Sequence, residues 1–345
     1  MSKTILITGG CGFIGTNTAC HYLKKGFKVV AFDNLSRTGA KENLEYLQQQ
    51  NGDFIFTKGD IRKADQILKA LSECKPDFVL HLAAQVTMVT SITNPREDFE
   101  INALGTFNIL EAMRLTQTNA VAIYSSTNKV LGELLKIPVI EEEKRYTYKM
   151  IKGINESFPL DFHGPYGCSK GCGDQYFIDY SRIFGLKTIV FRQSGIYGPH
   201  QFGIEEQGWL AWFCNALLFD KPVTIFGDGK QVRDVLYVQD LINAYEAAFQ
   251  NIDRTKGKAY NIGGADYSLS VWELFGILEK LSGRKFNFKF GSWRPGDQKI
   301  FISDISRAKN DFGWSPKTSP QDGVKKLYDW IYQNKTLIQQ SGVFK

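Results

Sequence analysis

The stretch TILITGGCGFIG, residues 4–15, decides the fold. An apolar, strand-like run, Thr4–Thr8, leads directly into TGGCGFIG, and a helical pattern begins at Phe13. The glycines satisfy both G-x-G-x-x-G, counted from Gly10, and G-x-x-G-x-x-G, counted from Gly9. Glycines in this arrangement allow a tight turn, a close approach of the backbone to a pyrophosphate and close helix–strand packing. The stretch therefore predicts a dinucleotide site in which the anion rests on the amides of a helix N-terminus.

Strands and helices alternate through the first half of the chain. Strand-like apolar runs are expected at Thr4–Thr8, Lys28–Phe32, Asp53–Thr57, Phe78–Leu82, Ala120–Tyr124 and Lys187–Phe191. Helices between them are expected at Phe13–Lys25, Asn43–Gln50, Lys63–Glu73, Asp98–Thr116 and Tyr166–Phe184. The strand-like runs lack polar alternation, as expected when helices cover both faces of a parallel sheet. The prediction is an α/β fold with a Rossmann-type, doubly wound parallel sheet and right-handed crossovers.

The regular alternation ends after Arg192. We expect residues 1–192 to form the dinucleotide-binding domain and residues 193–345 to form a smaller, discontinuous α/β domain, with some later segments returning to the first sheet. Its expected elements are a helix near Glu205–Phe219, a strand at Val223–Phe226 and helices at Val238–Phe249, Val271–Leu281 and Gln321–Gln333. The stretch Gly132–Pro165 has weak periodicity, and a loop of this length is more often functional than accidental.

The composition excludes several classes of protein. The chain has 345 residues, of which 43% are hydrophobic and 23% charged, as in ordinary globular proteins. Its net charge of +6 suits an anionic ligand, but no run of five or more Lys or Arg points to nucleic acid. The six cysteines form no C-x-x-C pair, which predicts buried free thiols in a reducing cytosol and no metal site. No secretory signal and no apolar run of about 18 residues is visible, so a cytoplasmic protein without a membrane partner is expected.

An acidic residue at the end of the second strand bears on the choice of cofactor. Asp33 follows Gly15 by 18 residues. A carboxylate there can bond both ribose hydroxyls and would repel a 2′-phosphate, which favours NAD over NADP. Arg37 lies nearby and keeps NADP open as an alternative. Four candidates follow the third and fourth strands, where they would either let a cofactor cross the strand ends or serve loop packing: Asp60, Ile61, Ala83 and Ala84.

The reacting groups are predicted from the spacing in PYGCSK. Tyr166 and Lys170 are four residues apart and share one face of a helix. A phenol with a pKa of about 10 is a poor base near neutrality, but an adjacent ammonium and a cationic nicotinamide ring favour the phenolate. Lys170 can also hold the nicotinamide ribose. With Thr127 at the end of the fifth strand, these residues form a candidate catalytic triad; the alternative is an unrelated surface pair.

Several motifs together resemble the extended short-chain dehydrogenase/reductases that act on nucleotide sugars: TGGCGFIG, DNLSR, GDIR, HLAA, the N-x-x-G-T of Asn102–Thr106, SST, PYGCSK and KQVRD. The resemblance covers essentially the whole chain. It implies a Rossmann domain that holds NAD and a C-terminal domain that holds a nucleoside diphosphate sugar. The cofactor-binding residues it implies are Gly9, Gly12, Phe13, Ile14, Asp33, Asn34, Ser36, Arg37, Asp60, Ile61, Leu82, Ala83, Ala84, Gln85, Asn102, Ser125, Ser126, Tyr166 and Lys170.

The same resemblance implies a substrate site. It matches Arg233 to an arginine that contacts the substrate diphosphate, and Arg294 and Asp297, in RPGD, to a second substrate-binding pair. Guanidinium groups suit this role because their forked donors fit phosphate oxygens. The other implied substrate-binding residues are Thr127, Asn128, Gln201, Gln207, Trp209 and Phe226. The aromatic helix that carries Trp209, Trp212 and Phe213 could equally be core. Relatives of this kind are commonly dimers or tetramers, so a homodimer or homotetramer is expected.

Two residues after the triad threonine indicate which reaction is possible. In the 4,6-dehydratases of this family an Asp–Glu pair follows the hydroxyl residue, whereas this chain has Asn128 and Lys129. Asn cannot donate a titrating proton, and Lys is normally fully protonated and a poor base. Water elimination is therefore disfavoured. Epimerisation by oxidation to a ketone and re-reduction on the other face needs only positioning and a polar clamp on the oxygen.

A narrower resemblance concerns the reacting carbon. SSTNKV, ES-x-x-LDFH-x-PYGCSKG and QGW-x-x-WFC are similar to carbon-2 epimerases of CDP-linked 3,6-dideoxyhexoses, which implies conversion of CDP-paratose to CDP-tyvelose. Leu131 stands where this branch usually has Tyr and is where a substrate difference is expected first. Gly195, Pro199 and His200 also depart from the pattern near the expected sugar. A different nucleotide sugar, a carbon-4 epimerase and a non-catalytic NAD-binding protein remain alternatives.

Overall fold

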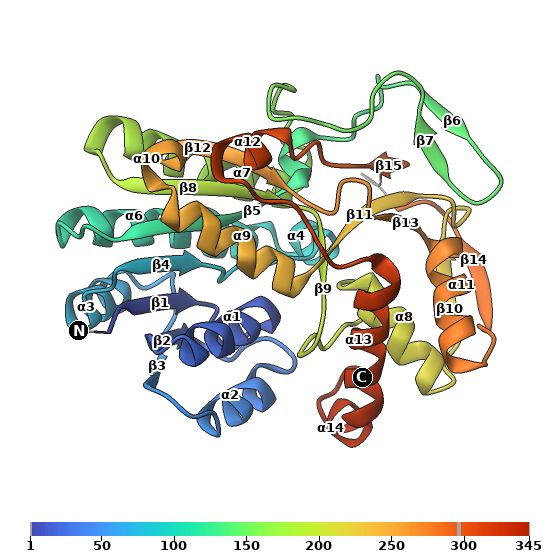
Figure 1. Cartoon of the computed structure of the whole chain (residues 1–345), viewed down its shortest axis with the longest axis horizontal. Coiled ribbons are helices and arrows are strands. Elements are labelled where there is room, and N and C mark those ends of the chain that lie inside the picture. Colours follow the sequence, from blue (N-terminus) through green and yellow to red (C-terminus); the bar gives the residue numbers. More distant parts are fainter. Residues whose placement is uncertain (1, 295–297, 345) are drawn as a thin grey trace.

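A seven-stranded parallel sheet forms the centre of the protein. The computed structural model describes residues 2–294 and 298–344. The strand order is β12-β8-β5-β4-β1-β2-β3, and every neighbouring pair is parallel (Figure 1). The strands are β1 (Thr4–Thr8), β2 (Lys28–Asp33), β3 (Phe54–Lys58), β4 (Phe78–His81), β5 (Val121–Thr127), β8 (Lys187–Gln193) and β12 (Lys258–Ile262). The predicted Rossmann-type sheet is confirmed.

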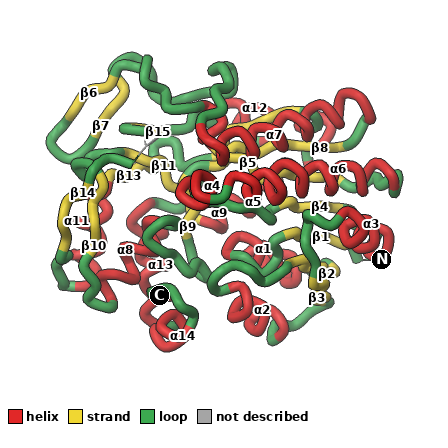
Figure 2. The backbone as a smooth tube through the Cα atoms, turned by 180° about the vertical axis from the view of Figure 1, so that it is seen from behind, coloured by secondary structure: helices red, strands yellow, loops and turns green. Residues whose placement is uncertain are grey.

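Helices cover both faces of this sheet because the side chains of its strands are apolar on both faces. In β1, Ile5 and Ile7 join one buried cluster and Leu6 joins another. The first cluster receives side chains from α1 (Phe13–Lys24), α2 (Ala40–Gln48), α9 (Val238–Gln250) and α12 (Ser306–Phe312). The second receives side chains from α3 (Ala64–Cys74), α6 (Gly105–Leu115) and α7 (Gly164–Phe184), which Figure 2 shows from behind.

The helix predicted over Asp98–Thr116 contains an irregular turn. It begins earlier, with α4 (Met88–Thr93) and α5 (Pro95–Phe99), and α5 continues through a π-helical turn, Glu100–Leu104, into α6. Asn102 lies inside this wide turn, and its side chain bonds the backbone of Gln85 in both directions, at 3.0 Å each. π-Turns of this kind are frequent at functional sites.

The second half builds a smaller part with its own core. Its strands are β9 (Gly195–Tyr197), β10 (Val223–Phe226), β11 (Val232–Tyr237), β13 (Ser268–Ser270), β14 (Phe288–Gly291) and β15 (Ile300–Phe301), and its helices α8 (Trp209–Leu218), α11 (Val271–Ser282), α13 (Pro320–Gln333) and α14 (Lys335–Gln340). These helices share a separate apolar cluster. The later elements β12 and α9 join the first sheet, and the short α10 (Ile252–Thr255) lies between them in the chain. The division into domains at residue 192 stays a prediction.

The long loop between β5 and α7 folds onto the second part. After a 3₁₀ turn, Asn128–Leu131, it forms a hairpin of β6 (Val139–Glu141) and β7 (Tyr146–Tyr148). Arg145 pairs with Glu273 at 3.0 Å, and the Tyr146 hydroxyl donates to Asp228 at 2.6 Å. These bonds hold the loop against the second part.

Leu131 has a different position from the one expected. Its side chain is 1% exposed and packs with Val130, Ile154 and Phe301 in an apolar cluster under the loop. The side chain thus belongs to the core of the loop, and the expectation that a substrate difference shows first at Leu131 stays a prediction.

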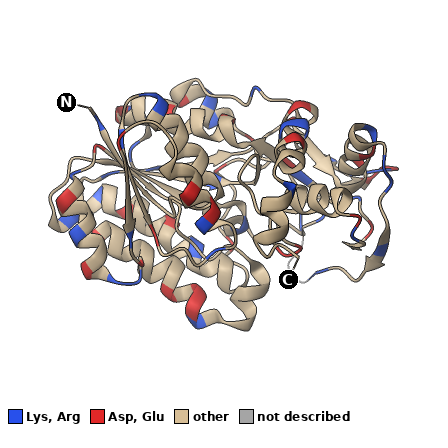
Figure 3. Cartoon of the chain, turned by 90° about the horizontal axis from the view of Figure 1, so that it is seen from below, with Lys and Arg blue, Asp and Glu red and all other residues tan. Residues whose placement is uncertain are grey.

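The surface charges are mixed in sign (Figure 3), and the cysteines differ in exposure. Lys and Arg are interspersed with Asp and Glu over the molecule (Figure 3). Within residues 2–294 and 298–344, no helix has the length and apolarity to cross a membrane, and no His, Cys, Asp and Glu cluster could hold a metal. All six cysteines are free, but only Cys11 and Cys214 are buried, and Cys168 is exposed. The prediction that the thiols are buried is therefore wrong for four of them.

Candidate active site

The glycine-rich turn leaves room for a ligand at the carboxyl edge of the sheet. Gly9 has a φ of 70°, and a Cβ atom there would lie 2.8 Å from the backbone nitrogen of Ala83. A Cβ atom on Gly15 would meet the carbonyl oxygen of Gly9. α1 thus starts directly against the end of β1, with its N-terminal amides at the edge of a cavity of about 370 Å³. This is the arrangement that binds a pyrophosphate.

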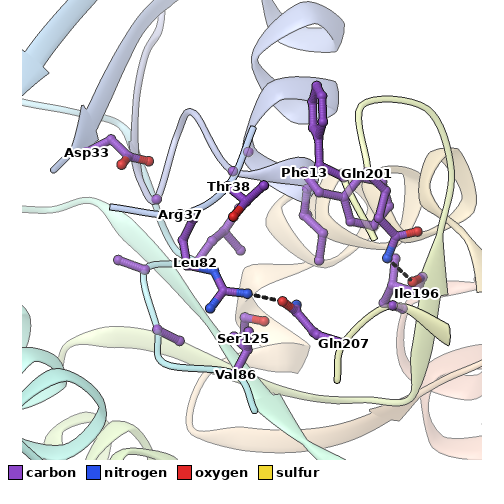
Figure 4. A pocket seen from close by; sticks show the side chains of 18 of the residues that line it. Phe13, Asp33, Arg37, Thr38, Leu82, Val86, Ser125, Ile196, Gln201 and Gln207 are labelled. Carbon is purple, nitrogen blue, oxygen red and sulfur yellow. Dashed lines mark hydrogen bonds between the residues drawn. The ribbon is translucent and has the colours of Figure 1, made fainter. Parts of the chain in front are cut away.

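Most of the predicted cofactor-binding residues line this cavity. They reach it from the ends of β1, β2, β3, β4 and β5 and from α7: Gly9, Gly12, Phe13, Ile14, Asp33, Asn34, Ser36, Arg37, Asp60, Ile61, Leu82, Ala83, Ala84, Ser125, Ser126, Tyr166 and Lys170. Gln85 and Asn102 are buried behind it and bond each other. Sequence reasoning missed further lining residues, among them Thr38 and Val86 (Figure 4). They carry no motif that could have found them.

Asp33 sits where a ribose would be bound. Its carboxylate accepts the backbone N–H groups of Cys11 and Leu35, at 3.0 and 2.8 Å. Burial raises the pKa of Asp33, while these hydrogen bonds oppose the change. Each carboxylate oxygen keeps capacity for a further donor, such as a ribose hydroxyl. The glycine turn and Asp33 together fit a dinucleotide without a 2′-phosphate.

Arg37 reaches across the cavity toward the second part of the chain. Its guanidinium donates to the side-chain oxygen of Gln207, which follows β9 (Figure 4). The two residues are 170 positions apart. The bond therefore ties the loop after β2 to the second part across the cavity.

The triad residues all line this cavity. Thr127 ends β5, and Tyr166 and Lys170 lie one turn apart on α7. Lys170 is 3% exposed, its Nζ donates to the carbonyl of Ser125 at 2.5 Å, and it lies 4.3 Å from the ring centroid of Tyr124. These contacts hold the lysine rigidly.

Burial dominates the ionisation of both groups. It lowers the pKa of Lys170 to about 7, against the attraction of Asp98 and Asp174. It raises the pKa of Tyr166 to about 12, although a hydrogen bond with Thr127 lowers it. The expectation that the ammonium and a cationic nicotinamide ring together lower the pKa of this phenol stays a prediction, since these shifts describe the protein groups alone. A further positive charge in the site is needed to favour the phenolate.

Asn128 belongs to a chain of hydrogen bonds behind the triad. The Thr127 hydroxyl lies 3.4 Å from Oδ1 of Asn128, and Nδ2 of Asn128 donates to Gln298 at 3.3 Å. Gln298, 1% exposed, donates in turn to the carbonyl of Gly132 at 2.5 Å. The amide of Asn128 is thus engaged with the protein.

A second cavity of about 300 Å³ adjoins the first and is formed by the second part. It contains the predicted substrate residues Phe226, Arg233 and Arg294 and shares Gln207 and Trp209 with the first cavity. The guanidinium of Arg294 lies over the Phe226 ring, 3.9 Å from its centroid. Lys129, Glu205, Glu206, Gln231, Trp212 and Phe213 also line it.

Other predicted residues take different places. Gln201 lines the first cavity and donates to the carbonyl of Ile196 at 3.3 Å. Asp297 lies outside the described residues. Phe213 is 6% exposed, so it is largely core, whereas Trp209 and Trp212 are half-buried cavity walls. The sequence gives Lys129 no binding role, although its position two residues after Thr127 indicates that it lies near the site.

His200 is a structural contact as well as a lining residue. It has a φ of 64°, and its ring packs against Tyr46, at 4.3 Å, and Trp330, at 5.1 Å between centroids. Burial lowers its pKa to about 4, so it is neutral at ordinary pH. Gly195 also lines the cavity. His200, which departs from the family pattern, therefore connects α2, through Tyr46, with α13, through Trp330.

Comparison with known proteins shows where this arrangement recurs. The family described as GDP-mannose 4,6 dehydratase matches residues 6–327. The chain is 49% identical over 333 residues to CDP-paratose 2-epimerase of Salmonella typhi, a match covering 94% of this chain and 98% of that protein. UDP-glucuronic acid 4-epimerase from Bacillus cereus, solved with UDP-glucuronic acid and NAD, has a TM-score of 0.82 and 30% identity over 96% of this chain and 99% of its own. A dTDP-glucose 4,6-dehydratase from Bacillus anthracis, solved with NAD, has a TM-score of 0.81 and 26% identity over 99% and 100%.

Proposed function

Since the chain belongs to the GDP-mannose 4,6 dehydratase family and is an NAD-dependent nucleotide-sugar epimerase, we propose that it inverts carbon 2 of a CDP-3,6-dideoxyhexose. The proposed reaction converts CDP-paratose to CDP-tyvelose. The observation that carries the choice of sugar is the 49% identity to a CDP-paratose 2-epimerase over almost the whole length of both chains.

The residues after Thr127 support epimerisation against elimination. Water elimination needs an acid and a base beside the reacting carbons. Asn128 is bonded through its amide to Gln298, and Lys129 lies on the wall of the second cavity; neither side chain is a carboxyl group. We therefore propose epimerisation for this chain, although its family is named after a dehydratase.

The protein's own groups handle the proton and the orientation. Bound NAD would supply a reversible hydride acceptor for a sugar carbon, so that no net redox change would occur. Tyr166 would accept the proton of the reacting hydroxyl at its phenolic oxygen and later return it. Thr127 would donate a hydrogen bond to the same sugar oxygen. Lys170, held on the carbonyl of Ser125, supplies positive charge beside Tyr166.

Inversion requires the sugar to present its opposite face between oxidation to the ketone and re-reduction. The diphosphate must therefore stay bound while the hexose turns. Arg233 and Arg294, in the second cavity, would hold it through their forked donors. The two cavities meet at Gln207 and Trp209. With the diphosphate held in the second cavity, the hexose would lie in the first cavity beside the triad.

NAD is favoured over NADP by the surroundings of Asp33. A 2′-phosphate would meet a buried carboxylate there. Arg37, which could have offset this repulsion, donates to Gln207. Gly9 and Gly12 would hold the pyrophosphate, and Asp33 the ribose hydroxyls.

We also propose that the protein works as a homodimer or homotetramer. Large apolar side chains are exposed along α6 and α7: Phe107, Leu115, Tyr176, Ile183 and Phe184. Exposed apolar surface of this extent on two adjacent helices is typical of an interface between subunits. The cytoplasmic location stays a prediction.

A carbon-4 epimerase is the second candidate. The structural similarity to a UDP-glucuronic acid 4-epimerase favours it, at 30% identity and a TM-score of 0.82. It would use the same triad on a different sugar carbon.

The test is to incubate the purified enzyme with CDP-paratose in deuterated water and follow the product by NMR. We expect CDP-tyvelose, without deuterium at carbon 2 because the hydrogen removed from that carbon is the one returned. Inversion at carbon 4 alone would contradict the carbon-2 proposal. Failure to turn over any nucleotide sugar, with NAD bound, would instead support a non-catalytic NAD-binding protein.

A further inference from the structure

A carboxylate that the proposed chemistry does not use lies buried behind the triad. Asp98, on α5, is 1% exposed. It accepts hydrogen bonds from the Ser169 hydroxyl, at 2.5 Å, and from the Asn102 side chain, at 3.1 Å. Both partners are neutral. Ser169 directly precedes Lys170 on α7, so the carboxylate is attached to the segment that carries the catalytic lysine.

Other charged and titratable groups around Lys170 are neutral or compensated. The groups facing it are Asp98 from α5, Asp174 and Tyr166 from α7, Tyr124 from β5, Arg192 from β8 and His81 from β4. Asp174 forms a double hydrogen bond with Arg192, at 2.9 Å for each contact, so the cation of Arg192 offsets part of its attraction for Lys170. Burial lowers the pKa of His81 to about 3 and raises that of Tyr124, which leaves both neutral.

Asp98 differs from Asp174 in that its hydrogen bonds come from neutral groups. Burial raises the pKa of Asp98, while these bonds and the attraction of Lys170 lower it. We propose that Asp98 is a positioning residue whose negative charge keeps Lys170 protonated inside the protein. The proposal rests on the proposed function in one respect, which is that it takes Tyr166 and Lys170 as the reacting pair.

The physical reason is the cost of burying an ammonium. A lysine that is 3% exposed loses most of its hydration, which favours the neutral amine. One carbonyl oxygen and one aromatic face give partial compensation. A fixed carboxylate nearby adds Coulomb attraction in a site with little water. Without it, Lys170 would lose its proton at a lower pH and would carry less charge beside Tyr166 near neutrality.

The test is an NMR titration of the full-length, NAD-loaded protein carrying ¹³C at the lysine Cε. The Lys170 signal is assigned by its absence in Lys170→Met. In Asp98→Asn, which keeps the size of the side chain, we expect the titration midpoint of Lys170 to fall by about 1 pH unit. The matched control is Glu100→Gln, which removes a carboxylate two residues away that pairs with the exposed Arg96 at 3.4 Å, and it should leave the midpoint unchanged.

The pH dependence of turnover gives a second measurement. Removing a nearby negative charge lowers the pKa of every neighbouring acid, so both limbs of the pH–rate profile should move to lower pH in Asp98→Asn. A purely structural disturbance of α5 would lower turnover without this shift.

The outcomes separate the two proposals. A Lys170 midpoint in Asp98→Asn that is unchanged or higher contradicts the role of Asp98, whatever the substrate is. A wild type that turns over no nucleotide sugar contradicts the proposed function, while the NMR comparison still decides the role of Asp98. If circular dichroism shows that Asp98→Asn does not fold, Asp98→Ser, which is neutral and smaller, carries the same expectation.

Discussion

At the scale of single residues, burial determines the chemistry of the site. It pushes Lys170 and Tyr166 in opposite directions, each toward its neutral form, to pKa values of about 7 and 12. The protonation states of Lys170 and Tyr166 can therefore change when a charged group enters or leaves the site. A tyrosine that gives and takes a proton depends on the cofactor's positive charge and on Lys170 together.

The clearest residue-scale prediction concerns the phenol. Tyr166→Phe removes the proton carrier and leaves the ring in place. We expect kcat to fall by about 10²- to 10⁴-fold, the usual contribution of a general acid–base group, with little change in melting temperature. The measurements are steady-state kinetics and thermal unfolding. Tyr176→Phe, on the exposed face of the same helix, is the control and should keep normal turnover. Comparable activity of the two variants would show that Tyr166 is not the base.

At the scale of elements, the turn between β1 and α1 is where sequence and geometry agree most closely. The glycines are needed because the backbone of the turn is packed against itself and against the end of β4. Neither contact can move easily, since both involve main-chain atoms. The helix start and the anion site are thus specified by one short segment.

Gly15→Ala tests this requirement. The added methyl group would meet the carbonyl oxygen of Gly9 and the backbone of Gly10. We expect α1 to shift away from the turn, a loss of about 1–3 kcal/mol in unfolding free energy and a clear loss of bound NAD. Chemical denaturation and quantification of released NAD are the measurements.

The control for this prediction is Gly276→Ala in α11, where a Cβ atom meets nothing within 4 Å. That change should be neutral or stabilise the protein by up to about 1 kcal/mol, because Ala favours a helix over Gly. Equal NAD content in Gly15→Ala and Gly276→Ala would contradict the role of the turn.

At the scale of the whole molecule, two cavities meet where the two parts of the chain face each other. The bond between Arg37 and Gln207 spans the first cavity and joins the parts directly (Figure 4). An enzyme that recycles its cofactor gains from slow cofactor release. This bond lies where it can slow that release.

Gln207→Ala should therefore release NAD faster. A single net hydrogen bond of about 1 kcal/mol corresponds to roughly a fivefold increase in the dissociation rate. Stopped-flow displacement of bound NAD measures it. Glu206→Gln, at the adjacent residue on the second cavity, should leave the rate unchanged. An unchanged rate in Gln207→Ala would mean that the bond does not restrain the cofactor.

The exposed apolar face makes a prediction about assembly. Ile183 on α7 is 63% exposed, and Ile183→Lys should disrupt the proposed subunit contact and give a smaller species in sedimentation velocity. Leu135→Lys, in the loop before β6 and 82% exposed, is the control and should leave the assembly intact. A wild type that sediments as a monomer would remove the basis of the proposal.

The sequence by itself determined six strands of the central sheet, the long helices and the nucleotide-binding turn, but not β12 or the short helices α4, α10, α12 and α14. These follow from local patterns, since apolar runs, glycine spacing and the four-residue step from Tyr166 to Lys170 act within a few turns of chain. Most cofactor-binding residues that the family resemblance implied do line the first cavity, because the carboxyl ends of parallel strands meet at one edge.

Tertiary structure alone decided which distant side chains meet. Leu131 is core because the loop folds back on Ile154 and Phe301. Arg37 bonds Gln207, which lies 170 positions away in the chain. The place of Asp98 beside Lys170 likewise depends on α5 packing against α7. The physical reason is that burial and electrostatic contact are properties of the assembled interior, and no periodicity along the chain encodes them.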